Sequence, residues 1–236
     1  MAYNLNRFHV DDYDWIRFDG PRAGEQAVDF TLYGTDGETV SLADYRGKWL
    51  VLEMGAVSCG MYAGNIKPNN ALSKDYPDVE FLVVYVREPH PGERTGAHNS
   101  MGEKINNAKE LKSLYGEYRK VAVDSLDGEM HTQYGLKPNS IYVINPEGQV
   151  IYRSDWTLPS ELKKVLDNRD QLHTNEHVTL DSLGFPPLGI QRKSLFKGGW
   201  RAVWEFIAMI PRLGPSHKQG DKYYKGHGYL ARGGTS

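Results

Sequence analysis

The chain has 236 residues and a nearly balanced charge, with 28 Lys and Arg against 30 Asp and Glu. Apolar residues make up 39% of it, enough for a packed core, and the charge balance gives the whole chain no electrostatic case for binding nucleic acid. The longest apolar run, 81–86, is far shorter than the ~20 residues that span a bilayer, and the first 15 residues lack the apolar stretch of a secretory signal. The single cysteine, Cys59, excludes an internal disulfide framework and a cysteine-rich zinc site, so we expect a reducing, cytoplasmic setting and no bound metal.

The expected strands and helices alternate along the chain. Each strand is a short apolar or alternating run, and each helix is a longer segment between turn signals. The expected strands are 30–32, 39–41, 49–54, 79–87, 121–123, 141–144 and 150–153. The expected helices are 61–76, 105–118, 129–134 and 159–172. Asp36 and Gly37 mark a hairpin between the first two strands, and Pro68 should kink or bound the first helix. This order predicts an α/β sheet covered by helices on both faces.

Charge and glycine content divide the chain into three parts. Over residues 190–236, nine basic residues stand against two acids, and the same stretch holds eight glycines. We therefore predict an N-terminal segment (1–24), a globular domain (25–171) and a basic, Gly-rich C-terminal extension (172–236).

Cys59 occupies a position that is typical of a reactive residue. It follows the apolar run 49–54 and precedes a helix, and ligands of open α/β sheets bind beyond the carboxyl ends of the strands. The free N–H groups at a helix start favour an anion, so we expect a nucleophilic or redox thiol with a lowered pKa. The alternative is a small, inert packing residue.

Two titratable residues follow the next strand. If the two strands are neighbours, Glu88 and His90 lie near Cys59. A histidine beside a thiol can donate a proton or pair with the thiolate, and a carboxylate can orient the imidazole or raise its pKa. The alternative is an ordinary solvated loop.

Two further motifs lie in the C-terminal extension. His173, Glu176 and His177 spell H-x-x-E-H, but poor helix formers surround them, so we do not expect a zinc site. Residues 199–213 place apolar side chains at helical spacing between basic flanks. We expect a helix that docks on its own core or on a second copy, as in a homodimer, with a membrane surface as the less favoured alternative.

The stretch QAVDFTLYGTDGETVSLADYRGKWLVLEMGAVSC resembles the opening of the redoxin branch of the thioredoxin-like superfamily. That opening has a D-F-x-L stretch, a D-G hairpin, an R-G-K turn, an apolar strand and then the catalytic cysteine. The resemblance covers about residues 24–167 and implies a thioredoxin-like central sheet flanked by helices, with an N-terminal hairpin. Two common patterns are replaced here. Tyr62 takes the place of the second cysteine of C-x-x-C, and Leu52 and Ala56 take those of Pro and Thr in the peroxiredoxin P-x-x-x-T-x-x-C.

A more detailed resemblance is to the iodothyronine deiodinase family. The loop GAVSCG is similar to the family's G-S-C-T-U-P, with Cys59 in the selenocysteine place and Ser58 in that of Thr. VYVREPHP is similar to V-Y-I-E-E-A-H-P, which puts Glu88 and His90 on catalytic positions. HNSMGEKI is similar to H-R-S-L-E-D-R-V, which puts His98 in the place of a histidine linked to substrate binding.

Together, the residues and the resemblance predict a thiol-dependent oxidoreductase of the deiodinase-like redoxin type. Cys59 would attack a halogen, sulfur or oxygen of a small-molecule substrate, His90 would protonate the leaving fragment, and Ser58 would stabilise negative charge. With no second cysteine, an external thiol such as glutathione or thioredoxin must reduce the enzyme, and no cofactor is expected to be bound. Two alternatives remain open: a one-Cys peroxiredoxin-like peroxidase, and a non-enzymatic redoxin-fold interaction module acting through its basic tail.

Overall fold

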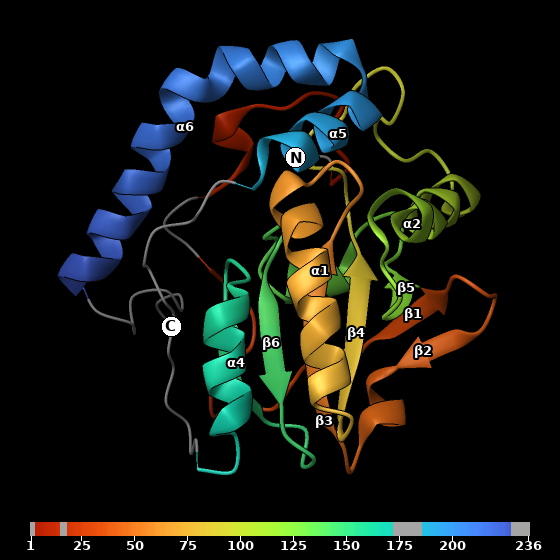
Figure 1. The fold of residues 1–236 in the computed structure, drawn as a ribbon, viewed down its shortest axis with the longest axis vertical. Helices are drawn as coiled ribbons and strands as arrows, with labels where there is room; N and C mark the ends of the chain where they lie inside the picture. The colour runs from red at the N-terminus through yellow and green to blue at the C-terminus, as the bar shows by residue number, and fades with distance from the viewer. Residues whose placement is uncertain (1–2, 15–17, 172–185, 228–236) are drawn as a thin grey trace.

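The computed structural model describes residues 3–14, 18–171 and 186–227 (Figure 1). In chain order the elements are η1 (Val10–Asp12), β1 (Thr31–Gly34), β2 (Thr39–Ser41), η2 (Leu42–Tyr45), β3 (Trp49–Gly55), α1 (Gly60–Asp75), β4 (Val79–Tyr85), α2 (Met101–Tyr115), β5 (Lys120–Val123), α3 (Glu129–Gln133), β6 (Ile141–Ile144), β7 (Val150–Ser154), α4 (Pro159–Asp167), α5 (Leu188–Gly198) and α6 (Trp200–His227); η1 and η2 are 3₁₀ helices. All seven expected strands are present, the first two as the expected hairpin.

The strands form one mixed sheet in the order β2-β1-β5-β4-β3-β6-β7. The three central strands, β5, β4 and β3, are parallel, and every other pairing is antiparallel. In this register Gly55 pairs with Tyr85, which in turn pairs with Val123. The carboxyl ends of the three strands therefore lie side by side, and the loops after β3 and β4 meet, as the sequence predicted.

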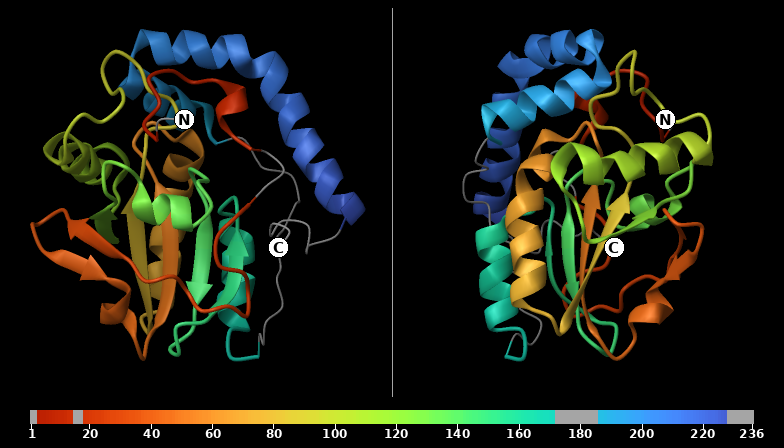
Figure 2. Two further views of the ribbon diagram at one scale, coloured as in Figure 1. Left: turned by 180° about the vertical axis from the view of Figure 1, so that it is seen from behind. Right: turned by 45° about the vertical axis from the view of Figure 1, so that its right-hand side comes forward.

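Helices cover the two faces of the sheet unequally. Alternate residues of each strand point to opposite faces. On β3, Val51 packs with α1 and α4, whereas Leu50, Leu52 and Met54 pack with α3, η2 and the segment 18–30. Nearer the carboxyl ends, α1 and α2 together cover Val83 of β4. Figure 2 shows α1 and α4 on one side of the sheet and the short α3 on the other.

Several element boundaries differ from the sequence prediction. The helix α1 continues across Pro68, because buried residues on both sides of it, Ile66 and Leu72, pack onto the sheet and outweigh the lost hydrogen bond. The helix α2 begins at Met101, four residues early, because the Ser100 side chain caps it by accepting from the N–H of Glu103 at 3.2 Å. The helix α4 ends at Asp167 rather than at 172.

The C-terminal extension turns back onto the core. The helix α5, which the sequence analysis did not foresee, packs against α1, and α6 follows it and contacts η1 of the N-terminal segment (Figure 1). The H-x-x-E-H motif, 173–177, lies outside the described residues. None of the helices in the described part of the chain has both the length and the apolar composition needed to cross a membrane.

Candidate active site

The loop between β3 and α1 places Cys59 at the first turn of α1. Cys59 is the N-cap residue: its Sγ accepts from the N–H of Tyr62 at 3.5 Å, and its own N–H donates to the carbonyl of Ala56 at 3.1 Å. The chain turns here only because Gly55 lacks a side chain, since a Cβ at that position would lie within 2.7 Å of the Tyr62 ring. The sequence prediction of a thiol at a strand-to-helix turn is confirmed.

Glu88 ties the two loops together at the edge of the sheet. Its buried carboxylate accepts from the N–H of Ser58 at 3.0 Å and from the hydroxyl of Tyr85, and it lies 3.4 Å from Nε2 of His98. Burial opposes a charge on Glu88, but His98, Ser58 and Tyr85 stabilise the carboxylate and hold its pKa below the ordinary value. Glu88 is therefore ionised, and it holds Ser58, Tyr85 and His98 in place.

His90 is held on the other side of Ser58. The Ser58 hydroxyl accepts from the backbone N–H of His90 at 3.2 Å. The imidazole packs against the rings of both Phe8 and Phe206, with centroid distances of 4.4 and 5.3 Å, and its buried Nδ1 has no hydrogen-bond partner among the described residues. Burial lowers the pKa of His90 to about 4, against the attraction of Glu88, so the ring is neutral at pH 7.

This geometry revises the role expected for Glu88. The sequence analysis has Glu88 orienting the imidazole of His90 or raising its pKa. Glu88 instead contacts the ring of His98, and no contact joins it to the ring of His90 among the described interactions. Glu88 does act to raise the pKa of His90, as expected, but burial beside two aromatic rings is the larger effect and lowers the pKa to about 4.

The thiol itself is closed off from solvent. Cys59 is 3% exposed, and burial raises the pKa of its thiol to about 12, because the loss of water outweighs the N–H groups of Tyr62 and Met61. The expectation of a lowered pKa is therefore wrong for this closed arrangement. The backbone donors are where the sequence predicts them, but burial of the sulfur removes its solvent, and a distant segment of the chain packs beside the site.

That segment is α5, which packs on the first turn of α1. A Cβ added at Gly60 would fall 1.9 Å from Oε1 of Gln191 and 3.1 Å from Oγ of Ser194. The junction of α5 and α6 also presses on the loop after β4, where the N–H of Arg94 donates to the carbonyl of Gly198 at 2.9 Å. We call Phe8, α5 and residues 200–213 of α6 the cover, because Phe8 and Phe206 pack on the ring of His90 and α5 packs on Gly60, next to Cys59.

A buried ionic network lies beneath α1, and the sequence analysis missed it. The Arg119 guanidinium contacts Glu53 of β3 at 2.5 Å and Glu117 at 2.6 Å, and the Tyr62 hydroxyl donates to Glu117 at 2.8 Å. The signal that could have revealed it is Glu53, an acid inside the apolar run 49–54. The network anchors Tyr62, the residue in the place of a second cysteine.

The N-terminal segment also reaches the carboxyl edge of the sheet. The Tyr3 hydroxyl bonds Nδ1 of His131 at 2.9 Å, and the Arg87 guanidinium donates to the carbonyl of Tyr3 at 2.8 Å. His131 is fully buried, and its other ring nitrogen bonds the carbonyl of Lys137 at 3.0 Å, so it holds the N-terminal segment on the sheet.

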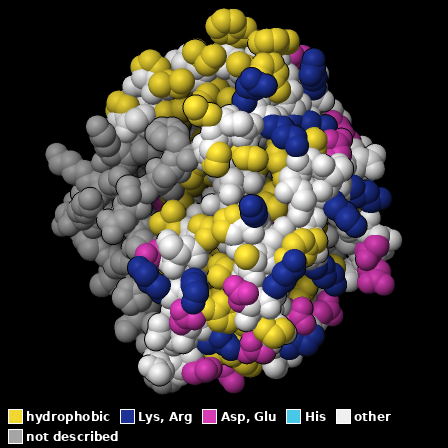
Figure 3. All heavy atoms as spheres, viewed as in Figure 1, with side chains coloured by type: hydrophobic (Ala, Val, Ile, Leu, Met, Phe, Trp, Pro, Cys, Tyr) yellow, Lys and Arg dark blue, Asp and Glu magenta, His cyan; other side chains and the backbone are white. Residues whose placement is uncertain are grey.

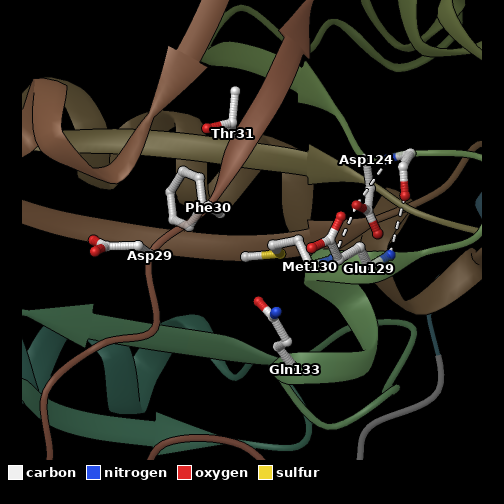
Figure 4. A pocket seen from close by; sticks show the side chains of 8 residues that line it. Asp29, Phe30, Thr31, Asp124, Glu129, Met130 and Gln133 are labelled. Carbon is white, nitrogen blue, oxygen red and sulfur yellow. Dashed lines mark hydrogen bonds between the residues drawn. The ribbon is translucent and has the colours of Figure 1, made fainter.

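A separate cavity of about 230 Å³ lies between β1 and α3 (Figure 4). Asp124 lines it, but its carboxylate already accepts from the N–H groups of Ser125, Met130 and His131 at 2.8–3.1 Å. Within the described ranges no group of three His, Cys, Asp or Glu side chains is arranged to hold a metal ion. This cavity therefore adds nothing to the chemistry of Cys59.

Comparisons with known proteins agree with this geometry. A 155-residue stretch, 58% of this chain, is 28% identical to a glutathione peroxidase of Lactococcus lactis subsp. cremoris and covers 95% of it. A 114-residue stretch, 44% of this chain, is 27% identical to a type II iodothyronine deiodinase of Petromyzon marinus, but spans only 39% of that protein's length.

Solved structures show the same fold. An uncharacterized conserved protein from Geobacillus kaustophilus aligns with a TM-score of 0.56 at 17% identity, over 70% of this chain and 90% of its own. A protein from Chlorobium tepidum, assigned as a thiol:disulfide interchange protein DsbE, aligns with a TM-score of 0.51 at 21% identity, over 66% of this chain and all of its own. These likenesses concern the thioredoxin-like fold.

The sequence model of the AhpC/TSA family matches residues 23–153, more than half of the chain. This region includes the β3–α1 loop with Cys59 and the loop after β4 with Glu88 and His90. The chain therefore belongs to the AhpC/TSA family, a redoxin family of the thioredoxin-like superfamily whose members are thiol oxidoreductases or peroxidases.

Proposed function

We propose that this protein is a deiodinase-like thiol oxidoreductase in which Cys59 is the single nucleophile. The observation that carries the proposal is the assembly at the carboxyl edge of the sheet. Cys59 caps α1, and Glu88 bonds the neighbouring Ser58 N–H while contacting His98, the candidate substrate-binding histidine. The similarity to a type II iodothyronine deiodinase supports the same reading.

The reaction begins with the transfer of a group X from a substrate X–Y to sulfur, where X is a halogen, sulfur or oxygen centre. The bond between Sγ and X forms as X–Y breaks, and Y leaves with the electron pair. Cys59 is oxidised by two electrons and Y is reduced. The thiol proton ends on Y, so the step is balanced as Cys–SH plus X–Y giving Cys–S–X plus H–Y.

His90 is the candidate for moving that proton. Burial lowers its pKa to about 4, so in the closed form the ring is a neutral imidazole at pH 7. Once the cover opens and water reaches the site, this imidazole takes the thiol proton as a base and then donates it to Y. Ser58 positions His90 through the 3.2 Å bond to its N–H, and the N–H groups at the start of α1 stabilise negative charge on sulfur.

An external thiol completes the cycle. A first thiol displaces X as H–X and leaves a mixed disulfide on Cys59, and a second releases Cys59 as a thiol together with an oxidised disulfide. Glutathione or thioredoxin fits this role, with no bound cofactor. Since both are kept reduced in the cytoplasm, we place the reaction there.

A one-Cys peroxidase is the second candidate. The glutathione peroxidase of Lactococcus lactis subsp. cremoris favours it, because the match covers 95% of that protein. In this case X–Y is a hydroperoxide, and Cys59 passes through a sulfenic acid before two external thiols reduce it.

A turnover screen tests the proposal. Iodinated phenols and hydroperoxides are offered with excess thiol, and substrate loss is compared between the wild type, Cys59→Ser and His90→Ala. We expect Cys59→Ser to be inactive and His90→Ala to lose ~10²–10⁴ in single-turnover rate. His9→Ala is the matched control, since its ring is partly exposed on the N-terminal segment. Equal consumption by the wild type and Cys59→Ser would reject the proposal.

A further inference from the structure

The helix α6 is apolar on two opposite sides. One side faces inward: Ala202 is fully buried, and Phe206 packs on His90. The other side consists of large apolar residues that remain open to solvent, spaced three or four apart as one stripe of a helix requires. They are Trp200, Trp204, Ile207 and Ile210, exposed by 55%, 65%, 47% and 52%. Docking on the core thus uses only half of the apolar surface of this helix.

No acid interrupts this outer stripe in the described part of α6. Glu205 faces inward, where it accepts from the N–H of Phe8 at 3.1 Å and lies 3.6 Å from Arg7. Glu93 borders the helix but accepts from the N–H groups of Trp200 and Arg201 at its first turn. Asp11 pairs with Arg212 at 2.9 Å. These three acids are therefore engaged with partners of their own.

Exposed apolar and basic residues also lie on α5. Leu188 is 87% exposed, and Arg192 and Lys193 are exposed on the same helix, where the ammonium of Lys193 donates to the carbonyl of Leu114. Figure 3 shows hydrophobic side chains gathered over α6 at the top of the molecule, with Lys and Arg next to them. We call Leu188, Arg192, Lys193 and the four exposed residues of α6 the outer face.

We propose that the outer face binds the surface of an anionic phospholipid bilayer. Two tryptophans on an apolar stripe with lysine and arginine at its border match an interface in which acyl chains lie below negative headgroups. A second copy fits less well, because two extensions with nine basic residues against two acids would be brought together. Since none of the described helices can span a bilayer, the binding is peripheral.

Flotation of the full chain with vesicles tests this proposal. We expect binding to phosphatidylcholine vesicles that contain phosphatidylserine, and at least a tenfold weaker partition for Trp204→Ser/Ile207→Ser, which lose apolar area that would enter the interface. Tyr33→Ser is the matched control, because Tyr33 is a 50% exposed aromatic residue on β1. Both variants change exposed side chains, and an unchanged melting temperature verifies that they fold.

The basic border is tested separately. Arg192→Glu should weaken binding to the phosphatidylserine vesicles, as should added salt, whereas Lys120→Glu, an exposed change on β5, should not. Three results would overturn the proposal. They are no flotation of the wild type, flotation unaffected by the Trp204→Ser/Ile207→Ser change, or a dimer that this change dissociates while vesicles bind neither protein.

Discussion

The thiol of Cys59 is subject to two opposing effects. The N–H groups at the start of α1 favour the thiolate, and the loss of solvent favours the neutral thiol. In the closed arrangement burial prevails and raises the pKa to about 12. A reactive thiolate therefore requires the cover to move, and the N-cap position becomes effective only when water or substrate reaches the sulfur.

The rate of alkylation measures this balance. In the full chain at neutral pH we expect Cys59 to react more slowly with iodoacetamide than a free cysteine does. Its rate should keep rising with pH beyond the ~8.5 at which a free thiol titrates. The signal is unambiguous because Cys59 is the only cysteine. An inflection at or below the free-thiol value would show that the cover does not control this residue.

The same raised pKa affects folding stability. Between pH ~8.5 and about 12 the unfolded thiol ionises while the buried one keeps its proton, so the folded state loses stability as pH rises through this window. Below ~8.5 the contribution is constant. Cys59→Ser removes the effect and provides the reference for unfolding curves.

Among the elements, α1 is held in place by a network of buried charged side chains. Arg119 pairs with both Glu53 and Glu117, and each of the three is almost fully buried. The position of Tyr62, and with it the first turn of α1, depends on this network through the bond to Glu117. A buried pair is costly to break, because the remaining charge has neither water nor a partner.

Arg119→Met should therefore destabilise the protein by about 3–5 kcal/mol, measured by urea unfolding at pH 7. The matched control is Lys48→Ala, which breaks a half-exposed pair with Glu80 at 3.3 Å and should cost less than about 1 kcal/mol. Similar losses for the two variants would contradict the stabilising role assigned to the network.

The contact between Gly198 at the end of α5 and the loop after β4, which we call the seam, holds the site closed. A Cβ added at Gly198 would lie 2.7 Å from the carbonyl oxygen of His90 and 2.7 Å from Cβ of Ala202. The closed form therefore has no space for even a methyl group at this position. A larger side chain fits only if α5 and the loop after β4 move apart. Gly189 lies on the same helix with nothing within 4 Å of its Cβ position.

Gly198→Ala should thus accelerate alkylation of Cys59. Overpacking costs about 1–3 kcal/mol and acts on the closed form, which corresponds to a rise of roughly 5- to 100-fold. Gly189→Ala should leave the rate unchanged, although it makes the same substitution in the same helix. If both variants react like the wild type, α5 is not the barrier to the thiol.

The helices and strands could be predicted from the sequence much better than the burial and the pKa values of the site residues. The strands carry their own signal in local apolar runs such as 79–87, and the meeting of Cys59 with Glu88 follows from neighbouring parallel strands. The packing of Gln191 and Ser194 against Gly60 joins residues more than 130 positions apart, and no local pattern contains it. Burial sets the direction of the Cys59 pKa, so the sequence predicted the place of this residue at a strand-to-helix turn but the wrong direction for its pKa.

At the scale of the whole molecule, three distant segments meet at His90. Phe8 comes from the N-terminal segment, Phe206 from α6, and His90 from the loop after β4. Arg212 and Asp11 add a second link between the two outer segments. The cover should therefore open as one cooperative unit.

Hydrogen exchange of Phe206→Ala tests that cooperativity. We expect faster exchange in residues 6–13, in 88–98 and in α6 together, because removing one ring loosens all three contacts. Amides of β6, which is paired on both sides with β3 and β7, should exchange as in the wild type and serve as the internal control. Faster exchange confined to α6 would show that the segments open independently.

The order of the chain has a consequence for how the site is made. Every strand of the sheet precedes α5 in the sequence, so a ribosome releases all the residues of the sheet before those that enclose Cys59. The thiol is consequently uncovered during an interval of each round of synthesis and becomes protected only when Gln191 and Ser194 reach Gly60. Oxidants present at the ribosome therefore encounter this cysteine in a form that the finished protein conceals.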